Sequence, residues 1–354
     1  MTSRVTVEAP KLGVRIPHPP LEGLSDAIGA KQLEVHWLAG DGSDRCYYRL
    51  HSPSLKEDFV LMQLSVDDAL KLQSDQYEWI HVGNTLQQFG VRVPALIKNL
   101  KSYAALIIED YGNKTFEQQA HSLLALGEWK ACKALYRDAS QIIVQFLKIP
   151  KLSGSWSRRS FDAERYYFET DFFLHHYGKP IAGLEFSQEE LDRYKQDLNA
   201  ISDYLASFSQ YFVHRDYHSR NLMYKNGKIA VIDFQDARLG SPAYDLVSLC
   251  FDSYVPLLPE QRLELMHQGL EALHTLGTDV GVSASEHWRA ILLQRQLKAI
   301  GSFGYLTLVK NRGNYLRYVR PALDTLAHDL VYDERWPFLS GTLLERIRRF
   351  NKTV

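Results

Sequence analysis

The sequence predicts an α+β protein in two parts, a small sheet-rich part followed by a larger and mostly helical part. Between Glu34 and Gly112, the short runs RCYYRL, FVLMQL and AALIIED are rich in aromatic and apolar residues, as strands are. Beyond Gly112, apolar residues recur at helical spacing over long segments. The 354 residues suffice for two lobes and a sizeable core. We therefore expect an arm over 1–20, a first lobe over 21–112 and a second over 113–354.

The first lobe should contain one helix among its strands. The proline-rich first twenty residues predict an arm rather than a packed element. Between the second and third apolar runs, Trp79, Val82 and Leu86 recur at helical spacing. Gly90 then ends this helix, and Pro94 opens the next strand.

The second lobe should consist mainly of helices. The segment LLALGEWKACKALYRDASQIIVQFL predicts a helix pair, and SFDAERYYFETDFFLHHYG predicts a further helix. Another helix should begin at Ser187, because Glu190 follows three residues later in the arrangement of a capping box. The chain from Pro259 to Phe350 is again mostly helical in pattern.

Composition and charge exclude several classes of protein. The formal net charge of −1 argues against a nucleic-acid binder held by bulk electrostatics. No apolar run approaches the roughly 18 residues of a membrane helix, and the first residues lack a signal-peptide core. Cys46, Cys132 and Cys250 are isolated, which argues against a disulfide framework. We expect a cytoplasmic protein with no membrane or obligate protein partner.

One stretch of the second lobe carries an unusual density of polar residues. FVHRDYHSRNLMYKNGKIAVIDFQDARLGSPAYDLVSL contains Asp216, Asn221 and Asp233 close together. Asn226 and Gly227 stand between two apolar segments and predict a tight hairpin, because both residues accept a positive φ. The hairpin should bring Asn221, before its first strand, near Asp233, at the end of its second.

This spacing points to metal and proton chemistry. An amide oxygen and a carboxylate, as on Asn221 and Asp233, suit Mg²⁺, which takes a few protein oxygens and completes its shell with water or phosphate. A separate carboxylate, Asp216, suits a base that accepts a proton from a hydroxyl. The alternative is that these residues only form turns and caps, as Asp and Asn commonly do. The pattern HRDxxxxN, followed by an apolar strand and Asp, favours the catalytic loop of a kinase.

These motifs resemble the aminoglycoside phosphotransferase superfamily, which has a bilobal protein-kinase-like fold. Within it, VHRDYHSRNLM and VIDFQDARLGSPAYDLVSL are closer to the bacterial cell-wall sugar kinases that phosphorylate the anomeric hydroxyl of N-acetylmuramate and N-acetylglucosamine. GSDRCYYRL, FVLMQL, IIEDYG, SFDAERYYFETDFF and RQLKAIGSFGYL agree in order, so the resemblance covers most of the chain after about Leu33. It implies a small antiparallel sheet in the first lobe, a mostly helical second lobe, and ATP in the cleft.

The resemblance implies roles for individual residues. Asp216 would be the catalytic base, and Asn221 and Asp233 would hold Mg²⁺. Asp245 would brace the catalytic loop. On the nucleotide side, the resemblance implies a phosphate loop at Gly40, Gly42 and Ser43. It implies the helix glutamate of such kinases at Glu78. It also implies a hinge that receives adenine at Glu109, Asp110 and Tyr111.

One position departs from the family pattern. The strand that should carry the ATP-binding lysine reads FVLMQL, with Met62 or Gln63 at the expected place, and the nearest lysine, Lys56, precedes the strand. Arg45, at the end of the glycine loop, is the first candidate for a substitute, and Arg49 is the second.

The sequence therefore predicts an ATP- and Mg²⁺-dependent kinase with a small sugar as its acceptor. One alternative keeps the enzyme and changes the acceptor to an aminoglycoside or an amino alcohol. Another is a catalytically silent kinase-like module, for which the missing strand lysine is the support.

Overall fold

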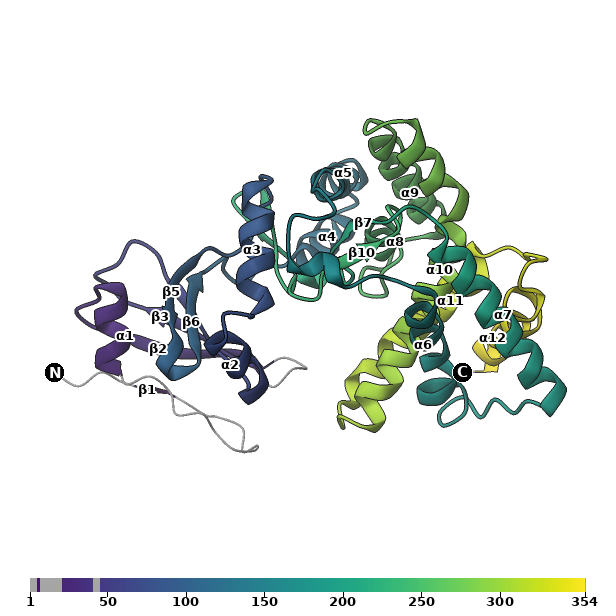
Figure 1. The fold of residues 1–354 in the computed structure, drawn as a ribbon, viewed down its shortest axis with the longest axis horizontal. Helices are drawn as coiled ribbons and strands as arrows, with labels where there is room; N and C mark the ends of the chain where they lie inside the picture. Colours follow the sequence, from purple (N-terminus) through teal and green to yellow (C-terminus); the bar gives the residue numbers. More distant parts are fainter. Residues whose placement is uncertain (1–4, 7–20, 41–44, 354) are drawn as a thin grey trace.

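A six-stranded sheet and a large group of helices lie at opposite ends of the molecule in Figure 1. The computed structural model describes residues 5–6, 21–40 and 45–353. The sheet has the strand order β1-β2-β3-β4-β6-β5, and every pairing except β1 with β2 is antiparallel. Its strands are β1 Val5–Thr6, β2 Glu34–Gly40, β3 Cys46–His51, β4 Phe59–Gln63, β5 Leu96–Leu100 and β6 Ala105–Glu109.

The N-terminal segment contributes one short strand to this sheet. Val5 and Thr6 pair in parallel with Val35 and His36 of β2. An unpacked arm was expected over 1–20, and these two residues depart from that expectation because the edge of β2 offers free hydrogen-bonding groups. The other residues of that range lie outside the described part of the chain.

The two faces of the sheet pack against different partners. Leu61 of β4 belongs to a small apolar cluster that also contains Leu24 of helix α1 (Leu21–Ile28). Val60 and Met62 belong instead to the main core, which also contains residues of helix α3 (Glu78–Gln88). Side chains alternate along a strand, so Met62 lies on the α3 side and Gln63 on the other.

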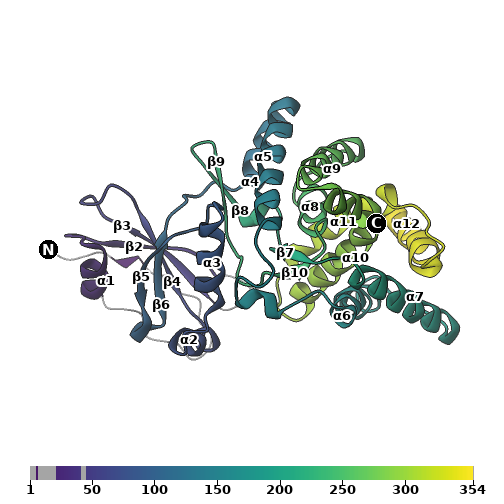
Figure 2. The same cartoon turned by 45° about the horizontal axis from the view of Figure 1, so that its top comes forward.

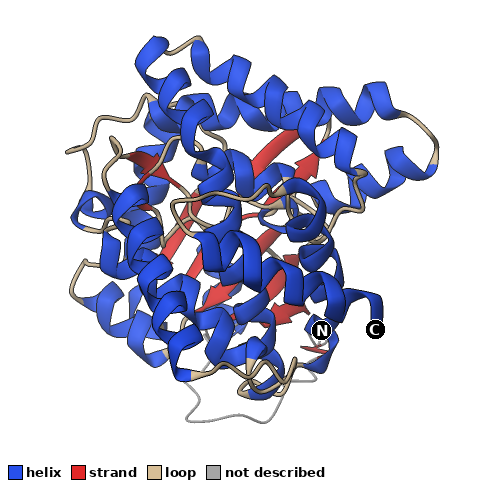
Figure 3. Cartoon of the chain, turned by 90° about the vertical axis from the view of Figure 1, so that its right-hand side faces the viewer, coloured by secondary structure: helices blue, strands red, loops and turns tan. Residues whose placement is uncertain are grey.

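The remaining elements of the structure are mostly helices, many of which face the viewer in Figure 3, and they include two short strand pairs, β7 with β10 and β8 with β9. They are, in chain order, α2 Val66–Gln73, η1 Lys101–Tyr103, α4 Phe116–Ala125, α5 Trp129–Leu147, η2 Ser155–Arg158, α6 Ala163–Phe173, η3 Leu174–Gly178, α7 Gln188–Ala206, β7 Tyr211–Val213, η4 Ser219–Asn221, β8 Leu222–Lys225, β9 Lys228–Val231, β10 Arg238–Gly240, α8 Tyr244–Cys250, α9 Pro259–His274, α10 Thr278–Leu308, η5 Gly313–Tyr318, α11 Val319–Asp329, η6 Phe338–Leu343 and α12 Leu344–Thr353.

Two features of the helical part position the candidate site. Helix α10, with 31 residues, packs against α6, α9 and α11, so it runs through the centre of this part. The β8–β9 hairpin lies between α3 and α5 in Figure 2, beside the sheet. Within the described ranges, none of the helices combines the length and apolarity that a membrane crossing requires.

Much of the expected architecture is confirmed. The three apolar runs form β3, β4 and β6, and the helix predicted around Trp79 is α3. The expectation of a single helix in the first lobe is wrong, because α1 and α2 also lie there. The predicted helix pair is α4 and α5, and Ser187 and Glu190 form the capping box of α7. The α+β class with five antiparallel strands and a mostly helical second part is likewise confirmed.

Candidate active site

The loop after β7 is held in its conformation by one buried carboxylate. Asp245 accepts hydrogen bonds from the backbone N–H groups of His214, at 2.6 Å, and Arg215, at 3.0 Å. Burial raises the pKa of Asp245 to about 7, and the two backbone donors oppose that shift. Arg215 has a φ of 81°, which is costly for a residue with a side chain and is maintained by surrounding contacts. Asp245 thus lies where the resemblance implied a brace.

The β8–β9 hairpin brings the three polar residues of the motif together. Asn226 and Gly227 both have positive φ, 53° and 73°, as its turn requires. At the open end, the Asn221 amide donates to the Asp216 carbonyl at 2.9 Å. The same amide lies 3.4 Å from the Asp233 carboxylate. Residues that are 17 positions apart in the chain therefore meet at one end of the hairpin.

Asn221 and Asp233 have the chemistry of a magnesium site. Asp233 has a φ of 63°, in the left-handed region, and 44% of its side chain is exposed. Gln235 donates to Asp233 at 2.8 Å. Two oxygen-bearing residues, one of them partly exposed, match an ion that keeps several water or phosphate ligands. In the described ranges, no group of three or more His, Cys, Asp or Glu side chains is placed to hold a metal.

Asp216 lies among three positive charges. The Lys298 ammonium is 2.7 Å from its carboxylate, Arg295 is 3.7 Å away and Arg215 is 3.8 Å away. Burial acts to raise the pKa of Asp216, but these charges outweigh it and hold the pKa well below its usual range. Burial lowers the pKa of Lys298 to about 8, against the pull of Asp216. Asp216 is therefore an ionised acceptor at neutral pH.

No role was assigned to Arg295 or Lys298 from the sequence. They lie about eighty residues after Asp216, on α10, and no motif spacing links the two segments. A signal was nevertheless present in ILLQRQLKAIGSF, where two cations interrupt an apolar helical run. Buried Arg and Lys are rare unless they are paired, so two cations within an apolar helical run predict a partner carboxylate elsewhere in the fold.

Arg45 reaches from the sheet to the candidate metal ligands. It follows the glycine-rich segment, is only 5% exposed, and lies 3.9 Å from the Asp233 carboxylate and 3.7 Å from that of Asp68 on α2. Gly40 is the last residue of β2. Gly42 and Ser43, the other expected members of the phosphate loop, lie outside the described residues.

The residues at the expected positions of the strand lysine and the helix glutamate do not form the ion pair of the family pattern. Met62 is fully buried on the α3 side of β4. Gln63 donates to the carbonyls of Tyr103 and Ala104. Glu78 begins α3 and accepts a 2.6 Å hydrogen bond from Ser155 of the helical part.

Glu78 is also approached by an arginine. Arg159 lies 3.5 Å from Glu78 and donates to the Gln235 carbonyl at 2.9 Å. Through these contacts, Glu78 joins α3 to the segment that follows Asp233, whereas a strand cation was its expected partner. Its role in nucleotide binding stays a prediction.

Helix α3 also contacts that segment through apolar groups. The ring of Trp79 lies 5.4 Å from the ring of Phe234, the residue after Asp233. A side chain added at Gly83 would meet the Phe234 ring at 3.3 Å, so the glycine leaves room for this contact.

The expected hinge is the connection after β6. Glu109 is the last residue of β6, and its backbone N–H donates to the Ala95 carbonyl at 3.0 Å. Asp110 accepts from Arg49 at 3.0 Å, which ties Arg49 to this connection. Tyr111 is buried, and burial together with the charge of Glu109 raises the pKa of its hydroxyl. Binding of adenine at Glu109 and Tyr111 stays a prediction.

Two cavities border this region, and of Asp216, Asn221 and Asp233 only Asp216 lines one of them. The first, of about 280 Å³, contains Asp216 and His218 from the loop, Lys298 from α10, and aromatic side chains that include Tyr254 and Phe303. Burial lowers the pKa of His218 to about 3, so this imidazole is neutral.

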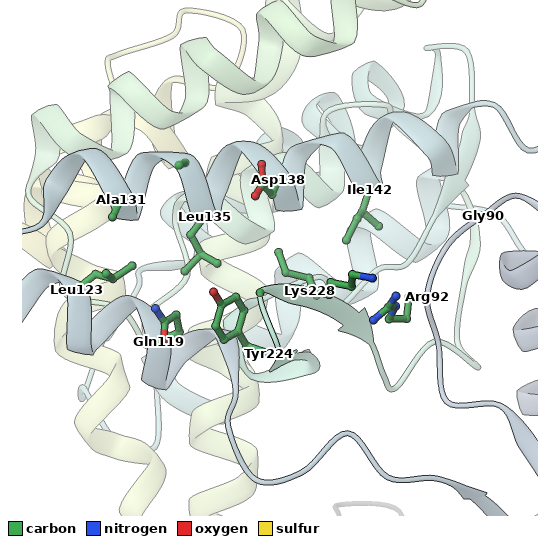
Figure 4. Close-up of a pocket in the computed structure, with 13 residues that line it drawn as sticks. Gly90, Arg92, Gln119, Leu123, Ala131, Leu135, Asp138, Ile142, Tyr224 and Lys228 are labelled. Carbon is green, nitrogen blue, oxygen red and sulfur yellow. The ribbon is translucent and has the colours of Figure 1, made fainter.

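The second cavity, of about 480 Å³, lies between α4, α5 and the β8–β9 hairpin. Figure 4 shows Asp138 of α5 above it, with Tyr224 and Lys228 of the hairpin and Arg92 on its other sides. None of the site residues expected from the sequence lines it.

A family model described as "Phosphotransferase enzyme family" matches residues 35–299 of the chain. The chain belongs to this family. The expectation of an enzyme that transfers phosphate is thereby confirmed.

Relatives of this phosphotransferase carry the name that the resemblance suggested. Proteins named N-acetylmuramate/N-acetylglucosamine kinase match it in Neisseria meningitidis, at 29% identity over 64% of the chain and 66% of the relative, and in Pseudomonas aeruginosa, at 27% over 78% of each. A relative with the same name in Caulobacter vibrioides is 27% identical over 83% of the chain and 86% of its own length. The chain thus spans slightly less than two thirds of the Neisseria protein and more of the other two.

Solved structures confirm the kinase-like fold of the phosphotransferase. An ADP-bound aminoglycoside phosphotransferase, APH(2'')-Ib, matches with a TM-score of 0.53 and 19% identity over 86% of this chain and 96% of its own. An ethanolamine kinase of Plasmodium vivax matches with a TM-score of 0.55 and 12% identity over 85% of this chain and 83% of its own. At these identities the similarity concerns the fold alone.

Proposed function

We propose that the protein is an ATP-dependent kinase that phosphorylates the anomeric hydroxyl of N-acetylmuramate and N-acetylglucosamine. The observation that carries this proposal is the meeting of Asp216, Asn221 and Asp233 at one end of the hairpin, beside a cavity with aromatic and cationic walls. The family membership and the name shared by the relatives support the same reaction. The proposed setting is the recycling of cell-wall sugars in the cytoplasm.

In this proposal, Asp216 accepts the hydroxyl proton and orients the acceptor oxygen for attack on the terminal phosphate of ATP. Asn221 and Asp233 would hold Mg²⁺, which when bound offsets the negative charge of the phosphates. Transfer of this kind depends mainly on position and charge, so a base of low pKa that fixes the hydroxyl is sufficient.

The nucleotide would lie between the sheet and the hairpin. Arg45 is the proposed substitute for the strand lysine, because it lies 3.9 Å from Asp233. Arg49 is bound to Asp110 and serves the connection after β6 instead. Gly40, Gly42 and Ser43 would cover the phosphates, and the connection at Glu109 and Tyr111 would receive adenine.

A panel of acceptors with Mg²⁺ and ATP tests the proposal. We expect transfer to both amino sugars and poor transfer to kanamycin-type amines, because the cations beside Asp216 repel a polycation. The product should be a 1-phosphate that is released by mild acid, unlike a 6-phosphate. Efficient transfer to an aminoglycoside or an amino alcohol, with none to either sugar, would replace this proposal with the other acceptor class. An absence of any transfer would favour a silent module.

A further inference from the structure

The acceptor side of the site has more positive than negative charge. Lys298 and Arg295, at positions i and i−3 of α10, are 11% and 9% exposed, and both approach the carboxylate of Asp216. Arg295 also donates to the Ser248 hydroxyl at 2.9 Å. Two buried cations therefore share one carboxylate.

The other carboxylates nearby make their direct contacts with other groups, and the charge of Lys298 also acts on Glu169. Glu169 of α6 lies 3.1 Å from Arg215 and 3.0 Å from Arg165. Asp252, which also lines the cavity, accepts backbone N–H groups of Ser219 at 2.8 Å and Tyr254 at 3.0 Å. An uncompensated buried cation is costly, so one further anion would complete the balance of charge in this part of the chain.

The surplus of positive charge borders the 280 Å³ cavity, where the acceptor would bind, rather than the proposed nucleotide site. Lys298 and Arg295 line the 280 Å³ cavity, whereas Asn221, Asp233 and Arg45 do not. On the nucleotide side, Arg45 already supplies a cation.

The rest of the cavity suits a sugar of modest size. Its wall includes the rings of Phe251, Tyr254 and Phe303, and Ser302 adds a hydroxyl. Apolar rings with a few placed polar groups are typical of pockets for small ligands. An acceptor that carries one acid group would match both the shape and the charge.

We propose that Lys298 and Arg295 form an anion-binding subsite for a carboxylate on the acceptor, which in the proposed function is the acid group of N-acetylmuramate. Lys298 would turn from Asp216 toward this carboxylate when the acceptor enters. N-Acetylglucosamine has no acid group and would leave the Lys298–Asp216 pair in place. This inference rests on the proposed function and adds the residues that distinguish its two acceptors.

The test is the ratio of kcat/KM for N-acetylmuramate to that for N-acetylglucosamine. In Lys298→Met we expect this ratio to fall roughly 10- to 100-fold, the usual effect of losing a charged hydrogen bond. The kcat/KM for N-acetylglucosamine alone reports how far the substitution disturbs Asp216. Lys298→Arg should retain much of the ratio, and Arg289→Met, which removes an exposed cation of the same helix, should leave it unchanged.

The methyl ester of N-acetylmuramate provides a second arm, because it keeps the shape and removes the charge. The wild type should prefer the acid over the ester, and Lys298→Met should treat them nearly alike. If Lys298→Met lowers kcat/KM equally for both sugars, the subsite is overturned. The two cations would then act on the transferring phosphate or on Asp216 alone. If the wild type phosphorylates neither sugar, the proposed function fails. If it phosphorylates both and the ratio does not respond, only the subsite fails.

Discussion

At the scale of single residues, Asp216 shows how surroundings set the character of a candidate base. Its carboxylate lies within 3.8 Å of three cations, which stabilise its ionised form. A carboxylate held in this state removes protons weakly but fixes a hydroxyl firmly. That combination fits phosphoryl transfer, in which the acceptor oxygen needs direction more than full deprotonation.

Replacing Asp216 should separate catalysis from nucleotide binding. Asp216→Asn keeps the shape and removes the proton acceptor, so we expect turnover to fall by ~10²–10⁴-fold. Binding of Mg²⁺-ATP, followed by calorimetry, should be largely kept. Asp203→Asn, an exposed change on α7, serves as the control. Turnover near the wild-type rate in Asp216→Asn would remove Asp216 from this role.

Loss of either candidate metal ligand should raise the Mg²⁺ requirement, but by different amounts. Asp233→Ala removes a formal charge and Asn221→Ala removes a neutral oxygen, so both should raise the Mg²⁺ concentration needed for half-maximal rate, Asp233→Ala more. Titration of the rate with Mg²⁺ at saturating ATP measures this. Unchanged Mg²⁺-ATP binding in Asp233→Ala would contradict the assignment.

At the scale of elements, three segments that are distant in the chain support one loop. Helix α8 supplies Asp245 to the backbone of the loop, α6 supplies Glu169 to Arg215, and α10 supplies Lys298 to Asp216. Each contact uses a charge with little exposure to water, so each should contribute to stability as well as to geometry.

The Glu169 contact should make stability depend on pH. Burial tends to raise the pKa of Glu169, but the charges of Lys298, Arg215 and Arg165 prevail and lower it. Because the pKa of Glu169 is lowered by folding, its ionised carboxylate stabilises the folded state. This stabilisation is fully present above the unfolded-state pKa of about 4.3 and is lost as the pH falls through the folded-state pKa. Glu169→Gln should therefore cost roughly 1.5–3 kcal/mol at pH 7.5. The difference should shrink toward acid pH in denaturant titrations, and a difference that grows would contradict this account.

The elements also show which features a sequence can predict. The hairpin was predictable because Asn226-Gly227 is a local signal, and the α7 capping box was predictable for the same reason. The partners of Asp216 on α10 were not, because tertiary packing across about eighty residues brings them together. The partner of Glu78 could not be inferred either, since Ser155 begins η2, a helix of four residues that is too short to give a periodic signal.

At the scale of the whole molecule, a few polar contacts join the sheet to the helical part. Arg45 approaches Asp233, Glu78 accepts from Ser155, and Lys225 of β8 donates to the Asp110 carbonyl at 2.9 Å. The nucleotide would bind at this junction, so the same contacts would adjust when it arrives.

Two arginines at this junction should behave differently. Arg45→Ala should weaken ATP binding or turnover while the fold is kept, because this guanidinium lies 3.9 Å from Asp233, a candidate metal ligand. Arg49→Ala should mainly lower thermal stability, because Arg49 binds Asp110 and lies 2.7 Å from Asn113. Calorimetric ATP affinity and melting temperature distinguish the two. A wild-type affinity in Arg45→Ala with a lost affinity in Arg49→Ala would reverse the assignment.

The contact between Trp79 and Phe234 gives the protein a natural optical reporter. An indole 5.4 Å from the ring that follows a candidate metal ligand should change its emission when that ligand is drawn toward an ion. The chain has six tryptophans, so replacing the other five with phenylalanine would isolate this signal. Stopped-flow fluorescence of such a variant would time the arrival of the nucleotide without a label.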